Sequence, residues 1–231
     1  TYTNEGMPIG AFWGYKTDGL IQTQEQLNAV KRADFQPNAE LGDVLFVDTN
    51  GDGKLDSSDR CMIGNPIPDI IYGINMGMAW KGFDLNLQFG GTIGNQIFNA
   101  MRYYTYFPND ITNKDRALMN YWTPNNTNTD IPRLTATDVN DNDRFSDMYV
   151  ENGTYFRLRN AQLGYTLPAS LTQRIKLQKV RFYVSCQNLF TISSYSGMDP
   201  EVGQSSSLSR GIDYGIYPQN ISFTGGINVT F

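Results

Sequence analysis

The 231-residue chain contains no histidine, only two cysteines and no long apolar run. Without histidine, the commonest general base and the commonest metal ligand are missing, so the composition argues against an enzyme. Cys61 and Cys186 form no CxxC motif, and we expect two unpaired thiols because nothing supports a disulfide between them. No segment approaches the roughly eighteen consecutive apolar residues of a membrane-spanning helix.

Positive charge is also scarce. There are 18 Lys and Arg residues against 23 Asp and Glu residues, which gives a net charge of −5, and no basic stripe is present to bind nucleic acid. A mean hydropathy of −0.42 would by itself indicate a soluble protein. Transmembrane β-barrels are an exception to that inference, because their lumen-facing residues are polar and each strand gives only a weak signal.

What the chain does contain is a set of segments in which apolar and polar residues alternate. In residues 221–231 the odd positions are apolar or Gly and the even positions are Ser, Thr, Gly or Asn, so one face of a strand would be apolar and the other polar. Residues 70–90, 154–166 and 179–192 repeat this pattern. With 70–90 divided into two strands, each strand has about the length that a tilted strand needs to cross a bilayer.

The segment 70–90 predicts a tight hairpin with a two-residue turn at Lys81-Gly82. In that hairpin Trp80 and Phe83 would pair across the turn, and every large apolar residue of both strands would lie on one face. In the segment 154–166 the apolar residues change phase, which predicts a β-bulge near Arg159-Asn160. A short helix over 23–31 and a short strand over 44–47 are also expected.

These segments predict an all-β fold, an antiparallel transmembrane β-barrel. The 14 Tyr and 13 Phe residues suit its aromatic girdles. We expect residues 1–69 to be an extracellular loop region and residues 70–231 to hold barrel strands with long external loops at 93–152 and 193–219. The short connections 81–82 and 167–178 would then face the periplasm.

Five strands are too few to close a barrel, and unpaired strand edges are not tolerated in lipid. The chain also opens without an initiator Met or a signal peptide. We therefore expect it to be the C-terminal part of a larger barrel, with the earlier strands outside this chain.

Residues 48–59 read DTNGDGKLDSSD and match the spacing of a twelve-residue calcium loop. Gly53 stands at position six, where such a loop turns sharply, and Asp replaces the usual Glu at position twelve. The candidate ligands are Asp48, Asn50, Asp52, the backbone carbonyl of Lys54, Asp56 and Asp59. We expect a structural Ca²⁺ here, while the alternative is a polar Asx-Gly turn that binds nothing.

A second group of candidates is the aromatic run Tyr103, Tyr104, Tyr106 and Phe107. These rings could stack on sugars or contact a partner protein. An interfacial girdle or a packed loop is the equally strong alternative.

An ordered series of short motifs along nearly the whole chain gives a family resemblance. The motifs are Pro8–Gly19, Asp48–Arg60, Ile63–Asp69, Lys81–Asp84, Tyr155–Asn160, Leu163–Pro168, Ser185–Phe190, Ser196–Glu201, Gly211–Asp213 and Tyr217-Pro218. Together they resemble the C-terminal region of the SusC/RagA-type TonB-linked outer-membrane proteins of Bacteroidota.

This resemblance implies a barrel of about 22 strands that is plugged by an N-terminal domain. It also implies TonB-driven uptake of oligosaccharides or peptides across the bacterial outer membrane, with a SusD-like surface lipoprotein as partner. Neither a plug nor a TonB box is found in this sequence, so contact with TonB would come from the missing N-terminal part. The motifs convey no substrate-contacting residue.

Two other functions remain open from the sequence. A soluble calcium-dependent adhesin or lectin-like module would pack the apolar strand faces against each other in a sandwich. A passive porin would share the strands but lack the plug. An enzyme is the weakest candidate, because the sequence offers no catalytic constellation.

Overall fold

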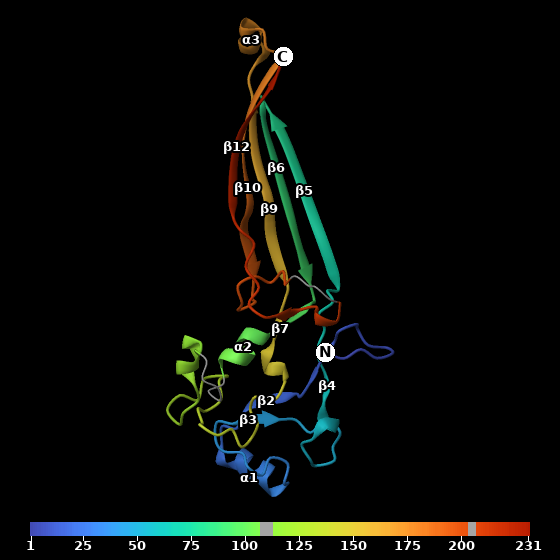
Figure 1. Cartoon of the computed structure of the whole chain (residues 1–231), viewed down its shortest axis with the longest axis vertical. Helices are drawn as coiled ribbons and strands as arrows, with labels where there is room; N and C mark the ends of the chain where they lie inside the picture. Colours follow the sequence, from blue (N-terminus) through green and yellow to red (C-terminus); the bar gives the residue numbers. More distant parts are fainter. Residues whose placement is uncertain (107–112, 203–206) are drawn as a thin grey trace. The chain divides into compact units, whose positions relative to one another are not determined.

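The computed structural model describes residues 1–106, 113–202 and 207–231, and these form two compact units (Figure 1). Unit 1 comprises Thr1–Ile67, Gln96–Asn152 and Val202–Ile216, and unit 2 comprises Pro68–Asn95, Gly153–Glu201 and Tyr217–Phe231. Within the described ranges, no helix has the length and apolar character needed to cross a membrane.

Unit 2 is a single antiparallel sheet of five long strands in the order β12-β10-β9-β6-β5 (Figure 1). Its strands are β5 (Ile70–Trp80), β6 (Phe83–Ile93), β9 (Tyr155–Thr166), β10 (Lys179–Ser193) and β12 (Ser222–Thr230). Short helical turns, α3 (Ala169–Thr172) and η4 (Gln173–Ile175), connect β9 to β10.

The hairpin and the bulge predicted from the sequence are both confirmed. Lys81 and Gly82 have φ values of 47° and 88°, as a two-residue primed hairpin turn requires, and Trp80 pairs with Phe83. Along β9, Asn160 pairs with Gln88 and Leu158 pairs with Phe89, so Arg159 is the extra residue of a bulge. All four expected strand regions of this sheet are present.

Unit 1 is built from short elements joined by turns. They are β1 (Phe12–Gly14), β2 (Thr17–Leu20), α1 (Gln24–Arg32), β3 (Val44–Phe46), η1 (Ser57–Asp59), β4 (Cys61–Gly64), β7 (Gln96–Asn99), α2 (Ala100–Thr105), η2 (Arg116–Asn120), η3 (Asp147–Tyr149), β8 (Val150–Asn152), η5 (Ser207–Ser209) and β11 (Ile212–Asp213). Strand β1 pairs with β4, β2 pairs with β3, and β7 lies between β11 and β8. The expected helix and the expected strand near residues 23–31 and 44–47 appear as α1 and β3.

Residues 93–152 were expected as a long polar connection, and their described parts, 93–106 and 113–152, contribute to the core of unit 1. Phe98 of β7 is 1% exposed and its ring lies 4.0 Å from that of Phe145 and 5.8 Å from that of Tyr149, measured between centroids. The same cluster includes Phe12 and Ile63, from the first segment of the chain. These aromatic residues are packed together in one hydrophobic cluster, which favours a folded arrangement of the segments that carry them.

A buried polar network joins residues 36–44 to residues 133–142 within unit 1. Asp43, fully buried, accepts hydrogen bonds from Arg133 at 2.6 Å and from the amide of Asn142 at 3.1 Å. Asn142 in turn accepts from the N–H of Val44, and Gln36 bonds both Val44 and Asn140. Buried polar groups that are satisfied in this way fix one arrangement of the segments.

Candidate functional site in the five-stranded sheet

The sheet of unit 2 has one apolar face and one polar face. Cross-strand partners point to the same side of a sheet, so the pairing register sorts the side chains of all five strands into rows. We use "apolar face" for the side that carries Ile74, Met76, Met78, Trp80, Phe83, Leu85, Leu87, Phe89, Phe156, Leu163, Tyr165, Phe182, Val184, Phe190, Ile192, Phe223, Ile227 and Val229. We use "polar face" for the opposite side.

Aromatic residues lie in rows at both ends of the apolar face. Near the hairpin turn, Trp80, Phe83, Tyr165 and Phe182 are consecutive cross-strand partners. Near the other end, the ring of Phe156 stacks on those of Phe89 and Tyr72, at centroid distances of 5.2 Å and 6.4 Å. The rows between them are largely aliphatic, for example Met78, Leu85, Leu163 and Val184.

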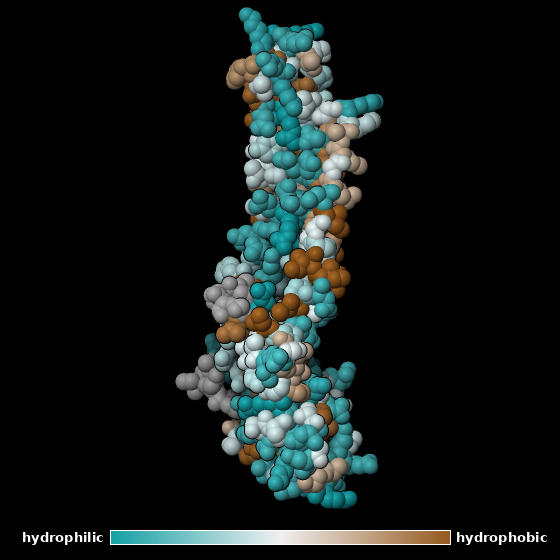
Figure 2. Space-filling view, turned by 90° about the vertical axis from the view of Figure 1, so that its right-hand side faces the viewer, coloured by the Kyte–Doolittle hydropathy of each residue, from teal (hydrophilic) through white to brown (hydrophobic). Residues whose placement is uncertain are grey.

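This arrangement has the dimensions and composition of a membrane-facing surface. Strand β5 has 11 residues, which is about 36 Å at roughly 3.3 Å per residue and about 25 Å high if it is tilted by about 45°. Large apolar side chains on this face are exposed, with Met78 67%, Trp80 68% and Phe223 75% exposed. In Figure 2 a band of hydrophilic residues runs along the length of the sheet, with hydrophobic residues beside it.

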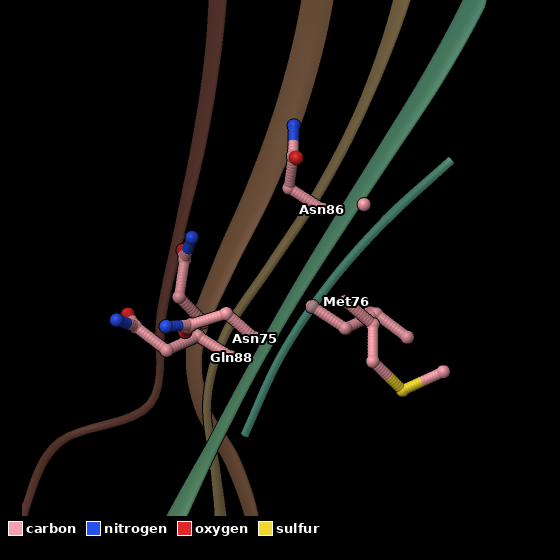
Figure 3. A pocket seen from close by; sticks show the side chains of 7 residues that line it. Asn75, Met76, Asn86 and Gln88 are labelled. Carbon is pink, nitrogen blue, oxygen red and sulfur yellow. The ribbon is translucent and has the colours of Figure 1, made fainter. Parts of the chain in front are cut away.

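The polar face carries rows of uncharged hydrogen-bonding side chains. One row runs through Asn75, Gln88, Asn160, Gln187 and Ser222, one residue from each strand. The first three of them also line an open hollow of about 320 Å³, together with Asn86. Figure 3 shows the amides of Asn75, Asn86 and Gln88 on one side of the ribbon and Met76 on the other. Such a face can form hydrogen bonds with water or with a polar ligand.

An ion pair crosses the polar face above strand β9. Arg181 of β10 donates from Nε to the carboxylate of Asp84 of β6 at 2.9 Å. Between them lies Gly164 of β9, where an added Cβ would collide with both side chains. The absence of a side chain at residue 164 therefore allows a charge pair to bridge strands that are not neighbours in the sheet.

A second charge network fastens residues 199–201 to the polar face. Arg157 of β9, with its side chain 2% exposed, donates to Asp199 at 2.5 Å, to Glu201 at 2.8 Å and to Thr191 at 2.8 Å. The bulge residue Arg159 also donates to Glu201, at 3.0 Å. The carboxylate of Asp199 accepts hydrogen bonds from the N–H groups of Glu201 and Gln219. By binding Asp199, Arg157 therefore positions the backbone at both residue 201 and residue 219.

The sequence did not predict this network, although both of its motifs were visible. The signal is a pair of arginines, Arg157 and Arg159, two residues apart in one strand. Asp199 follows Arg157 by forty-two residues, and Glu201 follows Arg159 by the same number. Only the fold brings these groups together, because the arginines lie in β9 and the two acids follow β10 in the chain.

The predicted calcium residues lie in one loop whose turns are closed by hydrogen bonds from backbone N–H groups to its side chains. Asp48 accepts the N–H groups of Gly51 and Gly53 at 2.6 Å and 2.8 Å, and Gly53 has φ +78°. Asn50 accepts from the N–H of Asp52, Asp52 accepts from that of Lys54, and Asp56 caps η1. Asp59 is fully buried and accepts from the N–H groups of Thr49 and Asp56.

Hydrogen bonds lower the pKa of two carboxyl groups in this loop. The N–H of Gly53 is the main cause of a lowered pKa at Asp48, and the hydroxyl of Ser58 is the main cause at Asp56. Ionised oxygen donors suit Ca²⁺. In the part of the chain that the structure describes, however, no three His, Cys, Asp or Glu side chains converge as a metal site would require.

The loop aromatics divide between two environments. Tyr103 packs in the core of unit 1, 5.2 Å from the ring of Tyr149 and 6.3 Å from that of Phe98, and burial raises its pKa. Tyr104 is 54% exposed, and the guanidinium of Arg102 lies 5.0 Å from the ring centroid of Tyr106. Phe107 lies outside the described residues.

The two cysteines are free thiols, as expected.

Replacing Arg157 by Leu is expected to release residues 199–201, because it leaves the buried carboxylate of Asp199 without its cation. Breaking a buried pair in this way costs about 3–5 kcal/mol, so the amides of Glu201 and Gln219 should exchange with deuterium at least about 100-fold faster. The measurement is hydrogen exchange followed by mass spectrometry. Arg174→Leu, at an exposed arginine, serves as the control, and equal exchange in both variants would contradict the role of Arg157.

No family model matches the chain, but it is similar to several known proteins. The chain is 38% identical to TonB-dependent receptor P3 of Formosa agariphila, over 98% of this chain and 22% of the receptor. It is 29% identical to TonB-dependent receptor SusC of Bacteroides thetaiotaomicron, over 85% of this chain and 18% of that protein.

Among solved structures, the RagAB peptide importer in its closed-closed state matches with a TM-score of 0.73 and 25% identity. That match covers 100% of this chain and 25% of the importer chain, so the chain spans about a fifth to a quarter of the length of these relatives. Over the segment that it covers, the chain therefore belongs to the SusC/RagA-type TonB-dependent receptors, which are proteins of the bacterial outer membrane.

Proposed function

We propose that this chain is the C-terminal part of a TonB-dependent outer-membrane importer, in which the sheet of unit 2 is one section of a closed barrel of about 22 strands. The observation that carries this proposal is the apolar face with aromatic rows at both ends. The outer edges of β5 and β12 have no strand partner among the described residues. Strands elsewhere in the receptor would pair with these edges, since lipid does not tolerate them open.

The proposed importer takes up oligosaccharides or peptides together with a SusD-like surface lipoprotein. The similarity to SusC and to a peptide importer supports import by a receptor rather than catalysis. Contact with TonB and the plug would belong to parts of the receptor outside this chain. The short connections at 81–82 and 167–178 would face the periplasm, and the long ones the exterior.

A structural Ca²⁺ in the 48–59 loop is a separate proposal. It is supported by the side-chain oxygens of Asp48, Asn50, Asp52, Asp56 and Asp59, by the carbonyl available at Lys54, and by the positive φ of Gly53. The ion would offset the repulsion of four carboxylates in a short loop. Its role would be to hold the loop in shape.

Substituting arginine at neighbouring positions tests which face of the sheet meets lipid. Leu163 is on the apolar face and Gln162 on the polar face. Leu163→Arg is expected to cost about 2–4 kcal/mol near the bilayer midplane, whereas Gln162→Arg costs little. The readout is the amount of full-length receptor in the outer membrane with heat-modifiable migration on a gel. Equal tolerance of both substitutions would contradict a lipid-facing role for the apolar face.

Import is tested by uptake into cells that carry or lack the full-length receptor. We expect radiolabelled oligosaccharide or peptide pools to enter only when the receptor is present and TonB is active, since the ligand passes a plugged barrel. Uptake that persists without TonB would support the passive porin. Binding without any uptake would support the adhesin.

Calcium binding is tested by hydrogen exchange of the full-length receptor in about 10 mM Ca²⁺, above the dissociation constants typical of extracellular calcium modules, and in a chelator. We expect the amides of Gly51, Gly53 and Lys54 to exchange at least about tenfold more slowly with Ca²⁺. Asp48→Asn together with Asp52→Asn should abolish the difference, and the exposed Asp18→Asn should not. Identical exchange in both buffers would show that the loop is an Asx-Gly turn that binds no Ca²⁺.

A further inference from the structure

Unit 1 contains a pocket of about 400 Å³ that the proposed import function does not use. Trp13, Tyr15 and Phe145 supply aromatic groups, and Gly14, two arginines and two aspartates complete the lining. This volume lies within the range of small-molecule sites in proteins. It would hold about thirteen water molecules at roughly 30 Å³ each, which is room for a ligand the size of a dipeptide.

The walls of the pocket are held by backbone contacts. The N–H of Tyr15 donates to the carbonyl of Phe145 at 2.9 Å, and the N–H of Asp147 donates to the carbonyl of Tyr15 at 3.1 Å. Gly14 lies so close to this segment that an added Cβ would collide with the Phe145 carbonyl. Gly14 also pairs with Cys61 in β4, which fixes the backbone next to Arg60.

Arg60 is placed over the aromatic floor with most of its donors available. Its Cζ lies 5.5 Å from the ring centroid of Tyr15, and its Nε donates to the Tyr15 hydroxyl at 3.3 Å. The neighbouring Asp59 is fully buried, so the chain is anchored just before this arginine. A guanidinium oriented in this way can bind a carboxylate through two parallel hydrogen bonds.

The four charges that line the pocket are not all paired with one another. Arg144 bonds the carboxylate of Asp141 at 3.0 Å and the carbonyl of Asn140 at 2.6 Å. Among the described residues, Arg60 has no acidic partner within salt-bridge distance, and the carboxylate of Asp143 accepts no hydrogen bond. The pocket therefore offers one positive and one negative group to a ligand.

We propose that this pocket binds a zwitterionic ligand, a free amino acid or a short peptide. Its carboxylate pairs with Arg60, its ammonium pairs with Asp143, and its side chain lies against Trp13. A neutral sugar could hydrogen-bond to both charged groups but would neutralise neither of them.

The test is calorimetric titration of the detergent-solubilised full-length receptor with alanylalanine, its C-terminal amide and its N-acetyl derivative. We expect each blocked probe to bind the wild-type receptor about tenfold or more weakly than the dipeptide, because each loses one charge-assisted hydrogen bond. Arg60→Gln should bind the dipeptide and its amide alike. Asp143→Asn should bind the dipeptide and its N-acetyl derivative alike.

Arg32→Gln and Asp18→Asn, at exposed positions outside the pocket, are the matched controls and should preserve the wild-type pattern. The proposal is overturned if alanylalanine does not bind the wild-type receptor, or if Arg60→Gln and Asp143→Asn keep the wild-type discrimination. It is also overturned if maltose displaces the dipeptide from the wild-type receptor. Binding is measured without transport, so loss of the proposed import function would leave this result unaffected.

Discussion

The cross-strand register of the five-stranded sheet is the constraint on which the other features of unit 2 depend. Side chains alternate with period two, so a slip of one residue would move Asn75 and Gln88 to the apolar face and Met76 and Leu87 to the polar one. The primed turn at Lys81-Gly82 sets the register of the first hairpin. The bulge at Arg159 keeps the apolar residues of β9 on one face of the sheet at the point where their alternation changes phase.

The same register creates the charge pairs of the polar face. Gly164 lies where a side chain would separate Asp84 from Arg181, and the bulge directs both Arg157 and Arg159 toward Glu201. Charges are thus confined to the polar face, where pairing and water can stabilise them. The apolar face carries none of these groups, which is the division that a receptor of the outer membrane requires.

The sequence predicted the sheet well and unit 1 poorly, for a physical reason. Alternation and turn residues are local signals, so the hairpin at Trp80 and Phe83 and the bulge near Arg159 could be predicted from their own neighbourhoods. Unit 1 is assembled from three separated segments through contacts such as Phe12 with Phe98. No local pattern encodes such contacts, nor the meeting of Arg157 with Asp199 or of Arg60 with the pocket. The calcium loop remains a prediction from spacing.

The most direct measurement of the central claim compares nitroxide labels at Val184 and Ser185 of the full-length receptor in lipid bilayers. Val184 lies on the apolar face and is 60% exposed, and Ser185 is the next residue, on the opposite face. Collision with lipid-dissolved oxygen should be high at residue 184 and low at residue 185. Equal shielding of both labels from lipid would contradict the account of this sheet as a section of a membrane barrel.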